Sequence, residues 1–412
     1  MSRQPRVIPP KPRPKSSPSP EATPPVGLKN SRSGRESVES FVVVFLGFLV
    51  WSLEAEGFVI PTGSMAPTLM GRHKDVTCPQ CGHDYAVNAD REVESSGPAT
   101  GKLPRVSAGT CENCRFESPL IDEPSFAGDR IYVMKSGLSL PFTSPESRLK
   151  LGRWDVGVFK LPENPEIRYI KRTIGMPGEV IRIQGGDLWV RPLDDPTVPF
   201  DRLRRPPEHQ RAMQMMVYDD SHRPKALADD PRWRRWAATS EGGWKETSDG
   251  TYTVSDDSEG QGQEAELRYR HLVTEPEQWR SITAGGELPY PPRASLITDF
   301  YSYNTDITGV DGPNPYRPWF QPDWVGDLTV SARLKVSRAA GRFRIDLIRA
   351  GVAGSCEIDL ATGEATLKHG SEALGISAKT GIRQGGEYEL TFANVDERLT
   401  LTVDGSYPFG EG

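Results

Sequence analysis

FVIPTGSMAPTL, at residues 58–69, follows directly after the chain's long apolar run, and YIKRTIGMPGE, at residues 169–179, comes about a hundred residues later. A serine hydroxyl is a weak nucleophile and needs a base beside it. A lysine can act as that base only if its ammonium is desolvated and loses its proton. Ser64 and Lys171 are residues of these two types, but by themselves they are most simply a turn serine and a solvated strand lysine.

The second stretch has the pattern of a β-strand, from residue 167 to residue 174. Side chains alternate along a strand, so Tyr169 and Lys171 are expected on one face, and Ile170 and Arg172 on the other. The positive charge of Arg172 would favour a neutral Lys171 if the two groups were close.

The two blocks resemble those of the Ser/Lys type I signal peptidases, and the resemblance covers residues 36–75 and 122–193. In that family a Pro-Ser/Thr-Gly-Ser-Met-x-Pro-Thr-Leu block holds the nucleophile, and a Tyr-Ile-Lys-Arg-x-x-Gly-x-Pro-Gly-Asp-like block holds the base. The resemblance implies a serine endopeptidase that cleaves N-terminal signal peptides from exported proteins and needs no cofactor for catalysis. It also implies a protein anchored in the inner (cytoplasmic) membrane of a bacterium.

Carried over position by position, the resemblance makes Ser64 the nucleophile and Lys171 the general base. The Ser64 backbone N–H and the Thr62 hydroxyl would form the oxyanion hole, aimed at the charge that develops during attack. Shallow apolar pockets for small substrate residues would be lined by Phe58, Ile60, Pro61, Leu69 and Ile170. The alternative for these apolar residues is plain core packing or lipid contact.

One block of the family is missing. It has the form Gly-Asp-Asn-x-x-x-Ser-x-Asp-Ser-Arg, and its nearest trace here is Tyr303-Asn304-Thr305-Asp306. The sequence ends within a β-type pattern, so we expect the chain to be a fragment of a longer protein. Two other functions stay open: a membrane-anchored glycan-binding protein with a degenerate protease core, and a self-cleaving Ser/Lys regulator.

The N-terminal segment has a basic tail and an apolar run. Residues 1–36 are rich in Pro and Ser and are expected to be disordered and cytoplasmic. Residues 37–60 are expected to form a single transmembrane helix in the lipid bilayer, with the catalytic body outside the cytoplasm. A cleaved secretory signal and a buried core helix are the alternatives. The net charge of -6 gives no sign of a nucleic-acid partner.

Four cysteines lie in two CxxC pairs within an insert at residues 76–119. They are Cys78, Cys81, Cys111 and Cys114. This spacing predicts a zinc-ribbon-like lobe with a structural tetrahedral zinc site. Two disulfides are the alternative, since the resemblance implies an exported location. Cys356 is left over and is expected to be a buried strand thiol.

The predicted fold is mainly β. A signal-peptidase-type core at residues 61–75 and 120–204 lies behind the helix, and residues 180–190 predict a β-hairpin with a Gly-rich turn. Residues 205–412 predict a polar linker followed by a concanavalin/laminin-G-like, jelly-roll-like β-sandwich with a possible glycan partner. Its expected strands are residues 328–336, 342–348, 356–360, 387–393 and 399–403.

Overall fold

The computed structural model is mainly β and falls into two units. One unit holds residues 1–56 and 134–138, and the other holds residues 57–133 and 139–412. Residues 1–30 of the predicted disordered tail lie outside the described residues. The described residues are 31–92, 105–134, 151–239, 243–248, 250–254, 264–303, 322–383 and 385–412.

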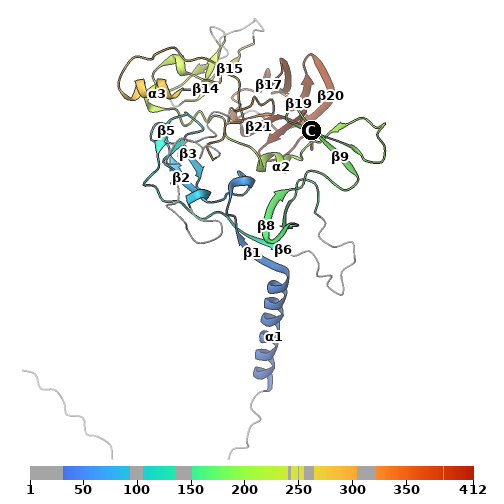
Figure 1. The fold of residues 1–412 in the computed structure, drawn as a ribbon. Coiled ribbons are helices and arrows are strands. Elements are labelled where there is room, and N and C mark those ends of the chain that lie inside the picture. Colours follow the sequence, from blue (N-terminus) through green and yellow to red (C-terminus); the bar gives the residue numbers. More distant parts are fainter. Residues whose placement is uncertain are drawn as a thin grey trace, which may run out of the picture. The chain divides into compact units, whose positions relative to one another are not determined.

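The long helix α1 (Ser31–Glu54) belongs to the first unit (Figure 1). It begins inside the segment expected to be disordered, and it ends before the predicted end at Ile60. Ala55–Val59 forms strand β1 instead, which pairs with β6 (Arg130–Met134). The predicted helical extension to Ile60 was therefore wrong. The physical reason is Gly57, because glycine disfavours a helix. Within the residues that the structure describes, no helix is both long and apolar enough to span a membrane.

The predicted hairpin of the peptidase-type core is confirmed. Gln184 pairs with Asp187 across a two-residue turn. Gly185 and Gly186 in that turn have φ values of 61° and 83°, which only glycine adopts without strain. The core strands are β7 (Val156–Leu161), β8 (Asn164–Arg172), β9 (Glu179–Gln184), β10 (Asp187–Pro192) and β11 (Asp201–Arg202), paired as β7-β8 and β11-β10-β9.

The cysteine lobe consists of two short hairpins, β2-β3 and β4-β5, with one CxxC pair at the tip of each. Its interior holds Lys74, which is fully buried and pairs with Glu92 at 2.9 Å. The Lys74 ammonium also donates to two backbone carbonyls, so it is satisfied although buried. The strands are β2 (His73–Thr77), β3 (Asp84–Asn88), β4 (Ala108–Thr110) and β5 (Glu117–Pro119), and a 3-10 turn follows β3 at Asp90–Glu92.

The segment after residue 205 is not the linker that the sequence predicted. Leu227, Trp233, Leu272 and Trp279 are buried in one core with the cysteine lobe, and α3 lies beside the lobe's strands (Figure 1). These few large apolar side chains from a polar segment extend the core of the cysteine lobe. The elements are α2 (Pro207–Ala212), 3-10 turns at Lys225–Leu227 and Pro231–Trp233, β12 (Trp236–Ala238), β13 (Lys245–Glu246), β14 (Tyr252–Thr253), β15 (Leu267–Tyr269) and α3 (Pro276–Thr283).

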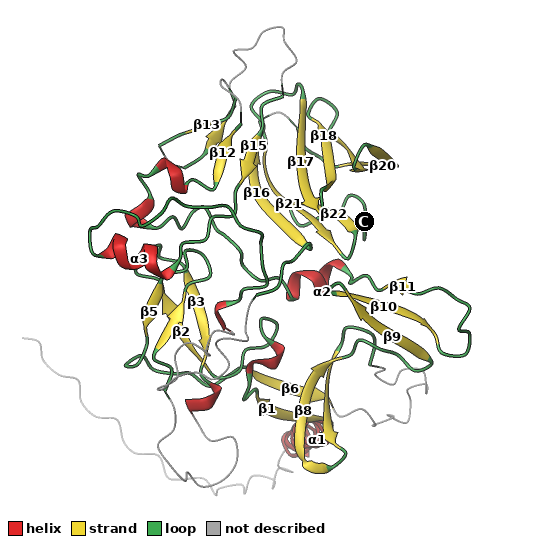
Figure 2. Ribbon diagram, turned by 45° about the horizontal axis from the view of Figure 1, so that its top comes forward, coloured by secondary structure: helices red, strands yellow, loops and turns green. Residues whose placement is uncertain are grey.

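The C-terminal part is built from two antiparallel sheets that share one core (Figure 2). All five expected strands are present in these sheets, whereas the likeness to a concanavalin/laminin-G-type jelly roll stays a prediction. Two strands were missed, β19 (Glu364–His369) and β20 (Glu372–Lys379). The sheets are β16-β21-β22 and β17-β18-β19-β20, and the other strands are β16 (Leu328–Lys335), β17 (Arg342–Arg349), β18 (Val352–Asp359), β21 (Glu387–Val395) and β22 (Arg398–Val403).

A cluster of ion pairs joins the hairpin β9-β10 to the two-sheet part. Arg205 contacts both carboxylate oxygens of Asp396, with Nε–Oδ2 at 2.7 Å, and reaches Asp327 at 2.8 Å. Arg349 bridges Asp327 and Asp187, at 2.9 and 3.0 Å. These three carboxylates lie close enough to hold a cation, but the arginines already neutralise them. We therefore assign the cluster a structural role.

Replacing Asp396 with alanine is expected to lower the free energy of unfolding by about 3 kcal/mol, because Arg205 would lose its bidentate partner in a poorly solvated place. Arg333→Ala is the matched control, since the Arg333 side chain is 67% exposed and pairs with Glu387 at 3.5 Å. Its loss is expected to cost at most about 1 kcal/mol. Urea unfolding curves measure both variants, and equal effects would contradict the structural role.

Candidate active site and metal centre

Ser64 lies in a single 3-10 turn, Gly63–Met65, which is separated from strand β1 by residues 60–62. Thr62 is extended, and its hydroxyl accepts no capping bond from the turn. The turn packs tightly against neighbouring backbone: a Cβ added to Gly71 would lie 2.3 Å from the Thr62 carbonyl carbon. The glycine at position 71 therefore permits a close approach that fixes the path of the chain through Ser64.

Asp129 holds the two ends of the Ser64 loop together. Its backbone carbonyl accepts from the Ile60 N–H at 2.9 Å, and its carboxylate accepts from the Met70 N–H at 2.7 Å. The Asp129 N–H returns a bond to the Met70 carbonyl at 2.9 Å. The start of the strand that follows the insert is therefore bonded to both flanks of the Ser64 turn.

Lys171 comes from strand β8, where it pairs with Gly157 of β7. Its Nζ donates a hydrogen bond to Ser64 Oγ at 2.7 Å, between residues 107 positions apart. Nζ also lies 5.6 Å from the centre of the Tyr169 ring, so the two side chains share a face as the strand pattern predicted. Ser64 and Lys171 are both exposed.

Arg172 points to the opposite face of β8. Its guanidinium donates to Thr68 Oγ1 at 2.8 Å and to the Trp154 carbonyl at 2.7 Å. Thr68 in turn donates to the Ala212 carbonyl at 2.7 Å. Arg172 therefore ties β8 to the Ser64 block, a role different from the electrostatic one considered from the sequence.

The five predicted pocket residues differ in exposure. Ile60 is 2% exposed and packs in the core. Phe58 is half-buried, with the Arg168 guanidinium 5.0 Å from its ring centre. Pro61 is exposed, whereas Leu69 and Ile170 are half-buried. Their role in substrate binding stays a prediction, as does the oxyanion role of Thr62.

The two knuckles of the cysteine lobe have the same backbone bonding. In each, the first cysteine N–H donates to the carbonyl five residues on, at 2.9 Å, and its own carbonyl accepts at 2.8 Å from the N–H of the residue after the second cysteine. That residue has a positive φ, 72° for Gly82 and 64° for Arg115. In the sequence, Gly82 indicates the positive φ of the first knuckle, whereas Arg115 gives no such sign for the second.

All four sulfurs of the knuckles face one another. They lie within 4.8 Å of each other, with Cys78–Cys114 at 3.5 Å and Cys81–Cys111 at 3.7 Å. Tetrahedral zinc with Zn–S bonds of about 2.3 Å would place sulfurs about 3.8 Å apart. The donor set therefore fits a structural zinc ion.

A second group of possible metal ligands lies beside the cysteines, at His83, Asp219 and His222. Each histidine already has a carboxylate partner: His83 contacts Glu112 at 3.2 Å, and His222 contacts Asp219 at 3.0 Å. Hydrogen bonding to Glu112 raises the pKa of His83. We assign these pairs to the packing of the lobe.

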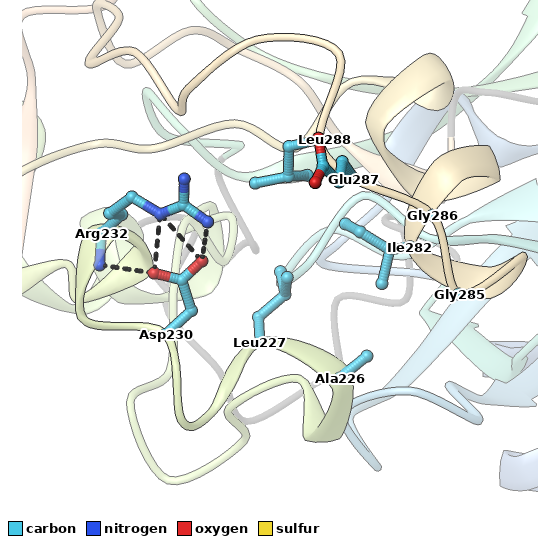
Figure 3. A pocket seen from close by; sticks show the side chains of 9 residues that line it. All are labelled: Ala226, Leu227, Asp230, Arg232, Ile282, Gly285, Gly286, Glu287 and Leu288. Carbon is cyan, nitrogen blue, oxygen red and sulfur yellow. Dashed lines mark hydrogen bonds and ion pairs between the residues drawn. The ribbon is translucent and has the colours of Figure 1, made fainter.

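Two further places in the structure are candidate ligand sites: a pocket and the sheet β17-β18-β19-β20. A pocket of about 550 Å³ contains the paired charges of Asp230 and Arg232 (Figure 3). Its lining includes no Ser, Thr, Cys, His or Lys, and its Asp230 is already paired with Arg232, so we assign it no chemistry. Ion pairs within the β17-β18-β19-β20 sheet link Glu357 to Lys368 at 2.8 Å and Glu364 to Lys379 at 3.2 Å. A glycan partner for this part stays a prediction.

Residues 117–237 match the family model described as signal peptidase, peptidase S26. The match includes strand β8 with Lys171, but it begins after Ser64 in the chain. It supports a signal-peptidase-type protease. Searches of curated proteins and of solved structures found no match. The family-model match covers neither the four cysteines nor the two-sheet part, so the zinc-ribbon-like and laminin-G-like assignments stay predictions.

Proposed function

We propose that the chain is a Ser/Lys endopeptidase that cleaves N-terminal signal peptides, with Ser64 as nucleophile and Lys171 as general base. The observation that carries the proposal is the 2.7 Å hydrogen bond between Lys171 Nζ and Ser64 Oγ. A nucleophile and base within hydrogen-bond reach are what acyl transfer requires. The family match over residues 117–237 supports the same reaction.

In the proposed mechanism, neutral Lys171 takes the proton of Ser64 Oγ while that oxygen attacks the scissile carbonyl carbon. The Ser64 N–H and the Thr62 hydroxyl donate to the oxyanion. The protonated Lys171 then gives its proton to the leaving amine, which leaves an ester on Ser64. A water molecule, deprotonated by Lys171, then attacks the ester, and Lys171 returns that proton to Ser64 Oγ as the acyl group leaves as a carboxylic acid. Because both side chains are exposed, the bound substrate must help to desolvate the ammonium.

We also propose that α1 attaches the protein to a lipid bilayer, with the basic N-terminal side in the cytoplasm. The support is the exposure of its apolar side chains: Phe41 is 69%, Val43 70% and Phe48 59% exposed. Such surface is favourable only against an apolar phase. Flotation with anionic lipid vesicles tests this, and equal flotation of a variant that lacks residues 1–54 would contradict it.

The proposed activity is tested by incubating the purified chain in detergent with a model preprotein. We expect one cut after the leader, mapped by mass spectrometry of the new N-terminus. A preprotein with bulky residues in place of the small ones before the cut is the matched control and is expected to stay intact. Cleavage of both substrates at scattered sites would contradict leader-peptide specificity.

A further inference from the structure

Tyr303 packs directly against the residue before Ser64. It is fully buried, and a Cβ added to Gly63 would lie 2.1 Å from Tyr303 Cε1 and 2.9 Å from Cζ. The ring therefore occupies the space beside Gly63 and contacts the turn that carries Ser64. Tyr303 is 239 positions away in the chain from Ser64 (303 − 64), so this contact depends on the tertiary fold.

Two of the three residues before Tyr303, Phe300 and Ser302, contact the cysteine lobe. Ser302 is fully buried, and its hydroxyl donates to the Thr110 carbonyl at 2.6 Å. Thr110 immediately precedes Cys111. The Phe300 ring lies 3.5 Å from the guanidinium carbon of Arg115, the residue after Cys114. Both ends of the second knuckle therefore contact the segment Phe300–Tyr303.

We propose that Tyr303 is a positioning residue for Ser64, and that the segment Phe300–Tyr303 links the Ser64 turn to the metal-binding cysteine lobe. The proposal rests on the proposed peptidase function. A Tyr303 ring held by the lobe stops the Gly63–Met65 turn from shifting sideways, and so keeps Ser64 Oγ within reach of Lys171. Displacement of a reacting atom by about 1 Å can cost about 100-fold in rate.

The first test uses Tyr303→Ala and Tyr303→Phe in the full chain. Tyr303→Ala is expected to lower kcat for leader-peptide cleavage about 10- to 100-fold, with KM within about threefold of wild type, because the turn moves but the substrate surface stays. Tyr303→Phe keeps the ring that contacts Gly63 and is expected to restore kcat. Equal losses in both variants, or a loss confined to KM, would overturn the positioning role.

The second test needs no activity. Amide hydrogen exchange of residues 61–72, followed by mass spectrometry, is expected to quicken about tenfold in Tyr303→Ala with its zinc retained. Removing zinc from the wild-type chain with a chelator is expected to quicken exchange in the same residues, and to add little in Tyr303→Ala. Unchanged exchange in the variant would overturn the inference. The two proposals can fail separately. If amide exchange in residues 61–72 differs between wild type and Tyr303→Ala but neither protein cleaves leader peptides, the proposed function is wrong, whereas the link between Tyr303 and the Ser64 turn is supported.

A double-mutant cycle sharpens the assignment to one contact. Gly63→Ala places a methyl group in the space of the Tyr303 ring, so alone it is expected to quicken exchange in residues 61–72. Combined with Tyr303→Ala, it is expected to add almost nothing, because the ring it would strike is gone. Fully additive effects of the two substitutions would show that Tyr303 does not act through Gly63.

Discussion

Replacing Ser64 or Lys171 with alanine is expected to lower kcat/KM for leader-peptide cleavage by at least about a thousandfold. The two groups are hydrogen-bonded at 2.7 Å, and each is useless without the other if they act as a nucleophile and its base. Residues that act as one unit give strongly non-additive losses. The double variant is therefore expected to be no worse than either single variant.

Lys160→Ala is the matched control for this pair. Lys160 is an exposed lysine on the neighbouring strand β7, so its loss removes the same charge without touching the site, and near wild-type cleavage is expected. Rates with a fluorogenic leader peptide measure all four variants. Lys171→Ala with cleavage close to wild type would remove lysine from the mechanism, and additive losses would separate the two residues.

Loss of the metal site is expected to unfold the cysteine lobe. We expect one zinc per chain, and none in Cys111→Ser. Structural zinc sites supply about 10–16 kcal/mol of folding free energy, more than the small hydrophobic core of the lobe can replace. The same core buries Trp233 and Trp279, so zinc removal is expected to shift tryptophan fluorescence as well.

Cys356→Ser is the matched control, because Cys356 lies in the separate core of the two-sheet part. It is expected to keep the full zinc content. Elemental analysis and limited proteolysis measure these variants, with new cuts expected between residues 73 and 119 only when zinc is lost. Protein that holds no metal and whose mass shows two disulfides would reverse the assignment.

The sequence predicted much of the local structure correctly. The glycines at 185 and 186 marked a hairpin turn, the CxxC pairs marked two knuckles, and alternation marked five of the strands in the two-sheet part. Strand β20 was missed because it is largely exposed on both faces and so lacks the alternation that reveals a strand. Strand β19 does alternate between buried and half-buried residues, so its pattern was present in the sequence and was overlooked. The helix was predicted to run on to Ile60, although Gly57 disfavours a helix and is visible in the sequence.

Contacts between distant segments were the least predictable. The two sequence blocks suggested that Ser64 and Lys171 meet, but nothing in the pattern indicated that Arg172 would bind Thr68. Tyr303 was noted only as part of a weak trace, and residues 304–306 of that trace lie outside the described residues. Leu227 and Trp279 looked like parts of a linker, because burial against the cysteine lobe depends on packing partners far away in the chain.

Covalent labelling of Ser64 tests the central claim most directly. A fluorophosphonate probe reacts with a serine whose hydroxyl is activated by a base, and peptide mapping by mass spectrometry locates the adduct. We expect the wild-type chain to carry one adduct, on Ser64, and Lys171→Ala to carry none, while Lys160→Ala is labelled as fast as wild type. Labelling of Ser64 that is equally fast without Lys171, or an adduct on a different serine, would contradict the proposed dyad.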